Sequence, residues 1–400
     1  MHINPDMAAT MAPPVMEARR WISGVTFPPD RPLINVSQAA PVAPPPEAMR
    51  AAMAEMVMRD PTVHLYGPVL GLPELREEVA RRTARIYGGQ IALEQVAITA
   101  GCNEAFTAIL ATLAGPGDEV ILPTPWYFNH KMALDMAGVG AVPLPSGPGL
   151  IPDPQAAGAL ITPATRALVL VSPNNPGGAE YPADVIAAFR DLARARGIAL
   201  IIDETYRDFH SGTGAPHSLF SDPDWDETVI HLYSFSKAYR LTGHRVGAIL
   251  ASPARLAQVE KYLDTVTICP PQLGQRAALW GMQNLDQWLA GERDEILSRR
   301  ATMEAGLATL DGWSILGCGA YFAYVKHPYE MSSAELAPAL VHAAGILMLP
   351  GTMFRPETDA SGAGEMRIAF ANADAGGIAT LITRLAQVDP AHLAAHRPLT

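Results

Sequence analysis

The sequence predicts an α/β protein with a mostly parallel sheet flanked by helices, followed by a smaller α+β domain. Between Gln95 and about Leu250, short apolar runs alternate with longer amphipathic stretches rich in Ala and Leu, a pattern typical of repeated βα units. The short runs are nearly all apolar, as expected of strands that helices cover on both faces. After about Leu285 the pattern changes, which indicates a separate α+β domain.

Three of the predicted strands of the larger domain precede a predicted helix. QVAIT leads to NEAFTAILATLA, DEVILPTP to NHKMALDMAG, and ALVLVSP to ADVIAAFRDLARARG, while IALIIDE, TVIHLYS and RVGAILA are further strands. In the smaller domain the helix DEILSRRATMEAGLATL precedes the strands GCGAYFAYV, ILMLPGTMF and EMRIAFAN. We place the large domain at 48–285 and the small domain at 286–400 together with the N-terminal segment 1–47. The tail VDPAHLAAHRPLT is predicted to be a solvated end.

The composition excludes several classes of protein. The 400 residues carry 29 Lys and Arg against 40 Asp and Glu, a formal charge of −11, without a basic cluster, so no nucleic-acid partner is expected. The chain lacks a signal-peptide pattern and any apolar run near the roughly 20 residues of a membrane span, which predicts a cytoplasmic protein without a membrane partner. The three scattered cysteines form no CxxC pair and predict neither a disulfide framework nor a metal site.

Polar, small or aromatic residues follow each of the main predicted strands. The strand ends read AGCN (100–103), PTPWY (123–127), SPNNPGG (172–178), DETY (203–206) and SFSK (234–237). In α/β sheets ligands bind beyond the carboxyl ends of the strands. These segments therefore predict one shared site at that edge of the sheet.

Lys237 lies at the polar end of an apolar strand in a chain that has only four lysines. A desolvated lysine amine beside cationic or aromatic groups becomes a nucleophile towards carbonyls and can carry a Schiff base. A lysine paired with an acid is the commoner situation, but it does not explain Ser234, Ser236 and Arg245 nearby. These three side chains could bind a phosphate, so the segment predicts an aldehyde cofactor with a phosphate arm.

The segment SFSKAYRLTGHRVG resembles the lysine signature of fold type I pyridoxal-phosphate (PLP) enzymes, specifically the class I and II aminotransferases. The resemblance extends from about Asn35 to Asn372 through YGPVLGLPELREEVA, TAGCNEA, PTPWYFNHKMA, SPNNPGG, DETYRDF, GAYFAYV, PGTMF and EMRIAFA. It implies the PLP-transferase fold type I, bound pyridoxal 5′-phosphate and a likeness to aspartate aminotransferase. It also implies an amino acid and a 2-oxo acid as small-molecule partners.

The resemblance implies catalytic roles for Lys237, Asp203 and Tyr206. Lys237 would form the Schiff base and move protons, and Asp203 would keep the pyridine nitrogen protonated so that the ring accepts electrons. Tyr206 and Asn175 resemble the pair that hydrogen-bonds the phenolic oxygen of the cofactor. The alternatives are a strand-end cap for Asp203 and a simple turn for the NNPGG segment.

Further cofactor contacts are implied at two other strand ends. Gly101, Cys102 and Asn103 lie where a strand gives way to a helix, whose free amides favour a phosphate; for Cys102 the backbone amide is preferred over the thiol. Tyr127 matches the ring that stacks on the pyridine. Trp126 is the alternative, one residue away, and the spacing to the following Asn-His pair favours Tyr127.

The remaining implied residues concern the substrate and a second subunit. Arg367 matches the arginine that binds the substrate's α-carboxylate, with a surface ion pair as the alternative. Tyr66 resembles a tyrosine that reaches the phosphate of a neighbouring subunit, which implies a homodimer with shared active sites. Ala39 and Ala40 replace the usual Gly-x-Pro-Asp-Phe type stretch at the substrate, so this loop departs from the family. Arg355 receives no role.

The predicted function is a PLP-dependent aminotransferase that moves an amino group from an L-amino acid to a 2-oxo acid by a ping-pong mechanism. The alternatives are a carbon–sulfur lyase or an amino-acid oxidase with the same cofactor site, and a cofactor-binding transcriptional regulator, for which no DNA-binding domain is present. No second arginine is evident for a dicarboxylic substrate. Aromatic or aliphatic donors are preferred, although the aromatic set of Trp126, Tyr127, Tyr321 and Phe322 could equally form core.

Overall fold

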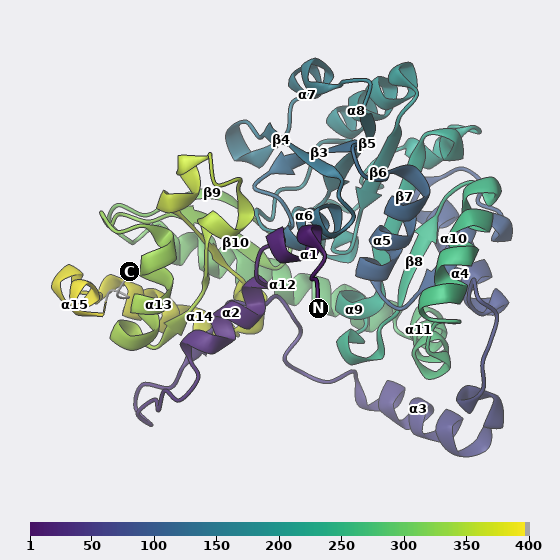
Figure 1. The fold of residues 1–400 in the computed structure, drawn as a ribbon. Coiled ribbons are helices and arrows are strands. Elements are labelled where there is room, and N and C mark those ends of the chain that lie inside the picture. Colours follow the sequence, from purple (N-terminus) through teal and green to yellow (C-terminus); the bar gives the residue numbers. More distant parts are fainter. Residues whose placement is uncertain (397–400) are drawn as a thin grey trace.

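A seven-stranded sheet forms the centre of the larger part of the protein (Figure 1). The computed structural model describes residues 1–396. The strand order is β2-β8-β7-β6-β5-β3-β4, and all neighbours pair in parallel except β8, which is antiparallel to both β2 and β7. The strands are β2 (Val96–Thr99), β3 (Glu119–Thr124), β4 (Gly140–Pro145), β5 (Thr165–Val171), β6 (Ala199–Asp203), β7 (Val229–Ser234) and β8 (Gly247–Leu250).

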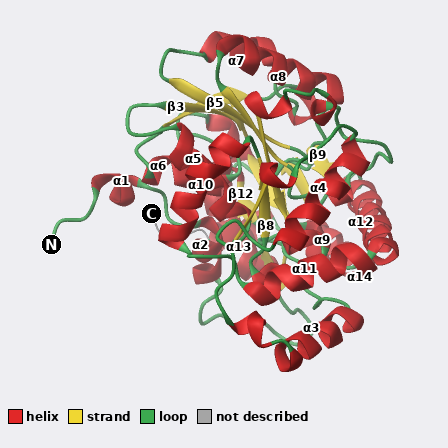
Figure 2. Ribbon diagram, turned by 90° about the vertical axis from the view of Figure 1, so that its right-hand side faces the viewer, coloured by secondary structure: helices red, strands yellow, loops and turns green. Residues whose placement is uncertain are grey.

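Helices cover both faces of this sheet (Figure 2). Alternate residues of β6 enter different cores: Leu200 and Ile202 pack in one cluster, whereas Ala199 and Ile201 pack in the other. The helices are α3 (Glu47–Arg59), α4 (Pro73–Tyr87), α5 (Cys102–Leu113), α6 (Phe128–Met136), α7 (Pro154–Leu160), α8 (Ala183–Arg196), α9 (Phe235–Ala238), α10 (Pro253–Val266) and α11 (Gln272–Asn284). Burial on both faces explains why the strands are apolar throughout, and it confirms the predicted α/β architecture.

A smaller antiparallel sheet follows in the C-terminal part of the chain. Its order is β12-β13-β10-β9, and a separate parallel pair joins β1 to β11. The strands are β1 (Ile34–Asn35), β9 (Ser314–Gly319), β10 (Phe322–Lys326), β11 (Ile346–Leu347), β12 (Leu349–Pro350) and β13 (Glu365–Ile368). The accompanying helices are α12 (Asp286–Leu307), α13 (Ser333–Ala344), α14 (Ala375–Ala386) and α15 (Pro390–Ala395).

The C-terminal tail contains a helix that the sequence analysis does not predict. Pro390–Ala395 form α15, which packs against α13, with Leu393 only 1% exposed in the core of the smaller part. Asp389 caps the helix by accepting a hydrogen bond from the amide of Ala391 at 2.9 Å. The prediction of a solvated end therefore misses the helix and its buried anchor Leu393, whereas the residues on either side, 389–391 and 394–396, are exposed as expected. The rest of the tail lies outside the described residues.

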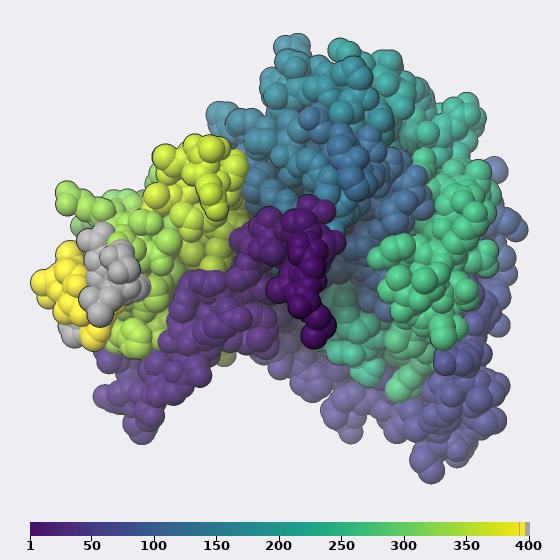
Figure 3. All heavy atoms as spheres, in the orientation of Figure 1, coloured from purple at the N-terminus to yellow at the C-terminus, as the bar shows by residue number. Residues whose placement is uncertain are grey.

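The N-terminal segment contacts both the larger and the smaller part of the protein. Helix α1 (Pro5–Ala9) packs against α6 beside the large sheet, whereas α2 (Pro14–Trp21) packs against α13 and β12 of the smaller part. Figure 3 shows this purple segment lying between the two parts of the molecule. The domain boundaries at 47/48 and 285/286 stay a prediction. Within residues 1–396 no helix combines the length and apolar composition that a membrane crossing requires.

Candidate active site

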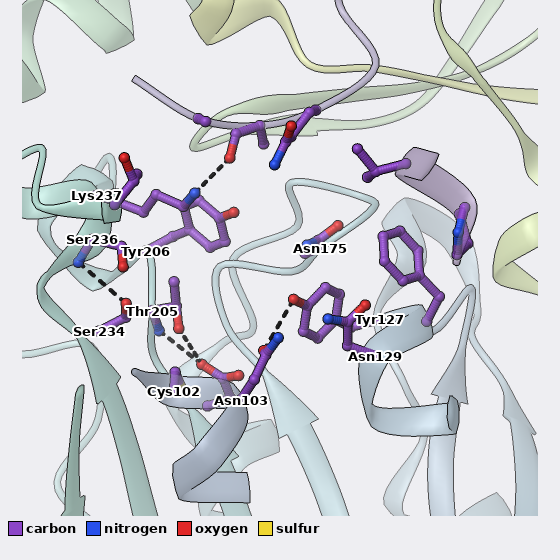
Figure 4. Close-up of a pocket in the computed structure, with 18 of the residues that line it drawn as sticks. Cys102, Asn103, Tyr127, Asn129, Asn175, Thr205, Tyr206, Ser234, Ser236 and Lys237 are labelled. Carbon is purple, nitrogen blue, oxygen red and sulfur yellow. Dashed lines mark hydrogen bonds between the residues drawn. The ribbon is translucent and has the colours of Figure 1, made fainter. Parts of the chain in front are cut away.

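A cavity of about 430 Å³ lies between the carboxyl ends of the central strands and the N-terminal segment, which forms its opposite wall (Figure 4). Most of the predicted site residues line this cavity. They are Ala39, Cys102, Asn103, Tyr127, Asn175, Asp203, Tyr206, Ser234, Ser236, Lys237, Arg245 and Arg367. The arrangement follows from the parallel strands, because their carboxyl ends share one edge of the sheet.

Lys237 projects from the short helix α9 into the cavity (Figure 4). Its Nζ donates a hydrogen bond to the carbonyl oxygen of Ala39 at 2.5 Å. Burial, followed by the positive charges of Arg245 and Arg367, lowers the pKa of the Lys237 amine to about 7. A large fraction of this amine is therefore unprotonated near neutral pH, so it can attack a carbonyl and accept a proton.

Asp203 ends strand β6 and is held as a carboxylate at the base of the cavity. Its Oδ1 accepts hydrogen bonds from the amide and hydroxyl of Thr205 at 3.0 and 2.7 Å, and its Oδ2 lies 3.3 Å from Nε2 of His130. Burial pushes the pKa of Asp203 upward, but the contacts with His130 and Thr205 outweigh it, and the pKa lies below the ordinary value. The site thus retains one buried negative charge, which suits a cationic partner.

A group of anion-binding donors lies around the start of helix α5. Gly101 precedes this helix at φ 95°, and a Cβ built there would lie 2.1 Å from Nη2 of Arg245. Arg245 itself has φ 49°, a backbone conformation uncommon for a residue other than glycine. Its guanidinium donates to the hydroxyl of Ser236 at 3.3 Å. A helix N-terminus, a guanidinium and a serine hydroxyl together form a suitable phosphate site.

Arg367 lies on β13 and enters the cavity from the smaller sheet. It is 2% exposed, and its Nη1 donates to Oδ1 of Asn175 at 3.1 Å while Nη2 donates to the carbonyl of Ser37. Its Nε has no hydrogen-bond partner within residues 1–396. Burial lowers the pKa of Arg367 to about 10, with Tyr206 and Tyr127 opposing the shift. A buried guanidinium with an unpaired donor fits a carboxylate ligand.

Two tyrosines flank these charged groups. Tyr127 lines the cavity and donates its hydroxyl hydrogen to Oδ1 of Asn103 at 3.2 Å, whereas Trp126 is 5% exposed within the core of the large sheet. Tyr206 packs edge-on against Phe322, and burial raises its pKa well above the ordinary value. The geometry thus places Tyr127 rather than its neighbour against the ligand space.

Four residues at the site are not predicted from the sequence. His130 and Thr205 both contact Asp203, and Arg19 and Gln38 line the cavity from the N-terminal segment. The Asn-His pair after Tyr127 is a usable signal for His130, because its spacing also distinguishes Tyr127 from Trp126 as the stacking residue. For Arg19 no signal existed, because nothing in its surrounding sequence shows that α2 approaches a site more than two hundred residues further along the chain.

Three other residues lie outside the cavity lining. Tyr66 is 78% exposed on the surface of the large part. Gly101 lies beneath Arg245 as part of the backbone support. Arg355 binds both carboxylate oxygens of Glu365, at 2.6 and 2.9 Å, and also Asp359, so its role is structural. Among residues 1–396 no group of three or more His, Cys, Asp or Glu side chains could hold a metal ion.

Comparison with known proteins identifies the family. The family model "Aminotransferase class I and II" matches residues 31–385. The chain is 32% identical over 309 residues to an arginine–pyruvate transaminase of Pseudomonas aeruginosa, covering 76% of this chain and 77% of that protein. It is 28% identical over 354 residues to an aspartate/prephenate aminotransferase of Thermus thermophilus, covering 86% and 87%.

The fold comparison agrees with the sequence comparison. The structure of an N-succinyldiaminopimelate aminotransferase from Mycobacterium tuberculosis superimposes with a TM-score of 0.87 at 26% identity, covering 97% of this chain and 100% of the other. These relatives carry aminotransferase names, which favours transamination over the lyase and oxidase alternatives. The predicted fold type, cofactor and reaction class are confirmed. The chain belongs to the class I and II aminotransferases and is a PLP-dependent transaminase of fold type I.

Proposed function

We propose that the cavity residues hold PLP and an amino acid in fixed positions, each through the chemistry of its own side chain. The cofactor supplies an aldehyde for amine exchange and a protonated ring that withdraws electrons from the substrate. Ser234, Ser236, Arg245 and the first amides of α5 would hold its phosphate. The fit rests on the close approach of Arg245 to Gly101, which leaves no room for a side chain there.

The ring would be held between polar groups of opposite character. The carboxylate of Asp203 would hold a proton on the pyridine nitrogen, since its low pKa keeps it charged. Tyr206 and Asn175 would donate hydrogen bonds to the phenolic oxygen, and the Tyr127 ring would pack against the pyridine. In this arrangement Tyr206 and Asp203 tune the cofactor from opposite sides.

Lys237 would transfer the proton, and Arg367 would orient the substrate. Binding of the α-carboxylate by the planar guanidinium of Arg367 fixes the substrate Cα within the cavity. Nζ of Lys237, with its pKa near 7, would take the proton from the substrate Cα as a general base and would then give it to the cofactor carbon as a general acid. The observation that carries this proposal is the convergence of Lys237, Asp203, Arg245 and Arg367 on one cavity.

The amino donor is an L-amino acid and the acceptor is a 2-oxo acid. The names of the relatives do not indicate which substrate side chain this enzyme prefers. Their names refer to aspartate and prephenate, to arginine, and to valine. These substrates carry acidic, basic and aliphatic side chains respectively. The side-chain preference therefore has to come from the residues of this cavity. The cytoplasmic location and the domain boundaries stay predictions from the sequence.

A homodimer would bring Tyr66 to the phosphate of a partner subunit. Leu65 and Tyr66 are 63% and 78% exposed, and Ile268 is 42% exposed. The two segments lie side by side, since the amide of Gly67 donates to Sγ of Cys269 at 3.4 Å. Exposed apolar side chains that cluster in this way are typical of an interface. Analytical ultracentrifugation should give a dimer that Leu65→Asp weakens; a monomeric wild-type enzyme would contradict the assignment.

Reductive trapping tests the role of Lys237 directly. Borohydride treatment of the holoenzyme should add the mass of reduced PLP to the peptide that contains Lys237, as measured by mass spectrometry. Lys237→Ala should abolish both the adduct and transamination. Lys261→Ala is the matched control, because Lys261 lies on α10 outside the cavity lining and its amine donates to Oε1 of Gln258 at 2.8 Å. An adduct on another residue, or transamination by Lys237→Ala, would refute the proposal.

A further inference from the structure

Arg19 is a cation of the active-site cavity that the roles assigned above leave unused. It lies on α2 and lines the same cavity as Lys237 and Arg367. Its Nη2 donates to Oε1 of Gln38 at 3.0 Å, and its Nη1 lies 3.9 Å from Sδ of Met16. Within residues 1–396 no carboxylate pairs with this guanidinium.

Three of the four cations that line the cavity have a role in the proposed function. The cations are Arg19, Lys237, Arg245 and Arg367, and the anion is Asp203. Asp203 is already engaged by His130 and Thr205. A phosphate would engage Arg245 and an α-carboxylate would engage Arg367, whereas the amine of Lys237, with a pKa of about 7, would carry the cofactor. Arg19, an exposed residue that lines the cavity, is the one of these four cations for which the proposed ligands supply no anion.

The loop SQAAPVA explains why Arg19 is left free. Where this loop passes the cavity it contains Gln38, Ala39 and Ala40 and no acidic residue. Gln38 offers an amide oxygen, which holds the guanidinium without neutralising its charge. The same loop supplies the carbonyl of Ala39 that accepts from Lys237. Gln38 is therefore placed to position Arg19 at the cavity without neutralising its charge.

A simpler explanation for a basic residue here is the end of α2. Arg19 and Arg20 both lie in the last turn of this helix, where positive charge interacts favourably with the helix dipole. That effect applies equally to both residues, but Arg19 lines the cavity and Arg20 does not. Arg20 is therefore a matched control that has the same charge, helix and turn.

We propose that Arg19 binds a second carboxylate at the end of the substrate's side chain, so that the enzyme prefers acidic, dicarboxylic amino acids. This inference rests on the proposed function, because it assumes that Arg367 takes the α-carboxylate in the same cavity. It differs from the expectation from sequence, which finds no second arginine for a dicarboxylic substrate and prefers aromatic or aliphatic donors. A guanidinium binds a carboxylate with two parallel hydrogen bonds, which gives selectivity over the uncharged amide.

The decisive measurement compares acids with their amides on the holoenzyme. The ratio of kcat/KM for glutamate over glutamine, and for aspartate over asparagine, should favour the acids in the wild type. Arg19→Gln should lower these ratios by about 10- to 100-fold, the range expected for loss of a hydrogen bond between charged groups. Arg19→Lys should restore part of the preference, and Arg20→Gln should leave the ratios as in the wild type.

A binding experiment separates this inference from the reaction. Calorimetry of the holoenzyme with succinate and with butyrate, which differ in one carboxylate, should show tighter binding of succinate that Arg19→Gln removes. Acid-to-amide ratios that are near one, or that do not respond to Arg19→Gln, would overturn the inference. If no amino acid is transaminated but succinate binding still depends on Arg19, the proposed function fails while the anion site stands.

Discussion

Two neighbouring carboxylates, Asp203 and Glu204, occupy different environments at the end of β6. Asp203 is 3% exposed and lines the cavity, with His130 3.3 Å from one carboxylate oxygen. Glu204 is fully buried, and its Oε2 lies 2.8 Å from Nε2 of His231 and 3.4 Å from Nε2 of His217. Successive side chains of a strand point to opposite faces, so adjacent acids enter different cores.

The two environments differ in what they leave available. Glu204 also accepts a hydrogen bond from the hydroxyl of Tyr87, and this ring stacks against His217 with centroids 4.6 Å apart. The cluster of Glu204, Tyr87, His217 and His231 is closed to ligands, whereas the Asp203 carboxylate faces an open space. A carboxylate next to a histidine thus faces the cavity at one position and is enclosed at the next, and access to the cavity distinguishes the two.

The largest expected effect comes from neutralising the carboxylate that faces the cavity. Asp203→Asn removes the charge that would hold a proton on the cofactor ring, so we expect kcat to fall by about 100-fold or more. Steady-state kinetics with saturating PLP measures the effect. Glu204→Gln is the matched control, because it makes the same chemical change one residue away, and it should keep kcat within about threefold. Equal losses in the two variants would contradict the comparison.

The reverse pattern is expected for stability. Glu204→Gln replaces charge-assisted hydrogen bonds from Tyr87 and His231 with weaker neutral ones, so the free energy of unfolding should fall by about 1.5 to 3 kcal/mol. Denaturant unfolding of the two variants measures the difference. Asp203→Asn should be affected less, since its carboxylate lies against the cavity rather than inside a closed cluster.

The closed cluster also predicts a loss of stability in acid. Burial pushes the pKa of Glu204 upward, but contacts with His217 and His231 outweigh it and hold the pKa well below its ordinary value of 4.5. The unfolded chain therefore takes up this proton first, and the stabilisation is lost as the pH falls below about 4.5. Burial lowers the pKa of His231, so the same reasoning gives a loss beginning below pH 6.5.

The measurement is the free energy of unfolding between pH 7 and pH 4 for the wild type and Glu204→Gln. The wild type should lose stability with falling pH, and the variant should show a shallower slope below about pH 4.5 because its residue 204 has no proton to bind. Parallel curves for the two proteins would show that Glu204 is not the group that titrates.

A smaller catalytic effect is expected from His130. The imidazole holds the Asp203 carboxylate and stacks on Phe106 with ring centroids 3.9 Å apart. Its removal in His130→Ala should raise the pKa of Asp203, because the interactions that lower it are lost. We expect the acid limb of the pH–activity profile to move to higher pH and kcat at neutral pH to fall by about tenfold. An unchanged acid limb would show that Thr205 alone keeps Asp203 charged.

The comparison also shows what the sequence could and could not predict. The strand and helix pattern, Lys237 and the strand-end residues follow from local periodicity and from motif order, both of which the chain displays directly. The choice between Asp203 and Glu204 came from the family resemblance, since DETY contains two acids and the sequence alone does not show which one faces the cavity. Arg19 and the buried Leu393 depend on contacts distant in sequence, and local pattern carries no record of them.

The smallest expected effect comes from removing a single hydrogen-bond donor from the closed cluster. Tyr87→Phe removes the hydroxyl that donates to Glu204 while keeping the ring packed against His217 and Phe220. Because His231 still binds the carboxylate, we expect the free energy of unfolding to fall by only about 1 kcal/mol, with kcat unchanged. The double variant with Glu204→Gln should lose less stability than the two single losses together, since Glu204→Gln weakens the same hydrogen bond that Tyr87→Phe removes. Full additivity in this double-mutant cycle would mean that Tyr87 and Glu204 stabilise the protein independently, and the cluster would then not act as one unit.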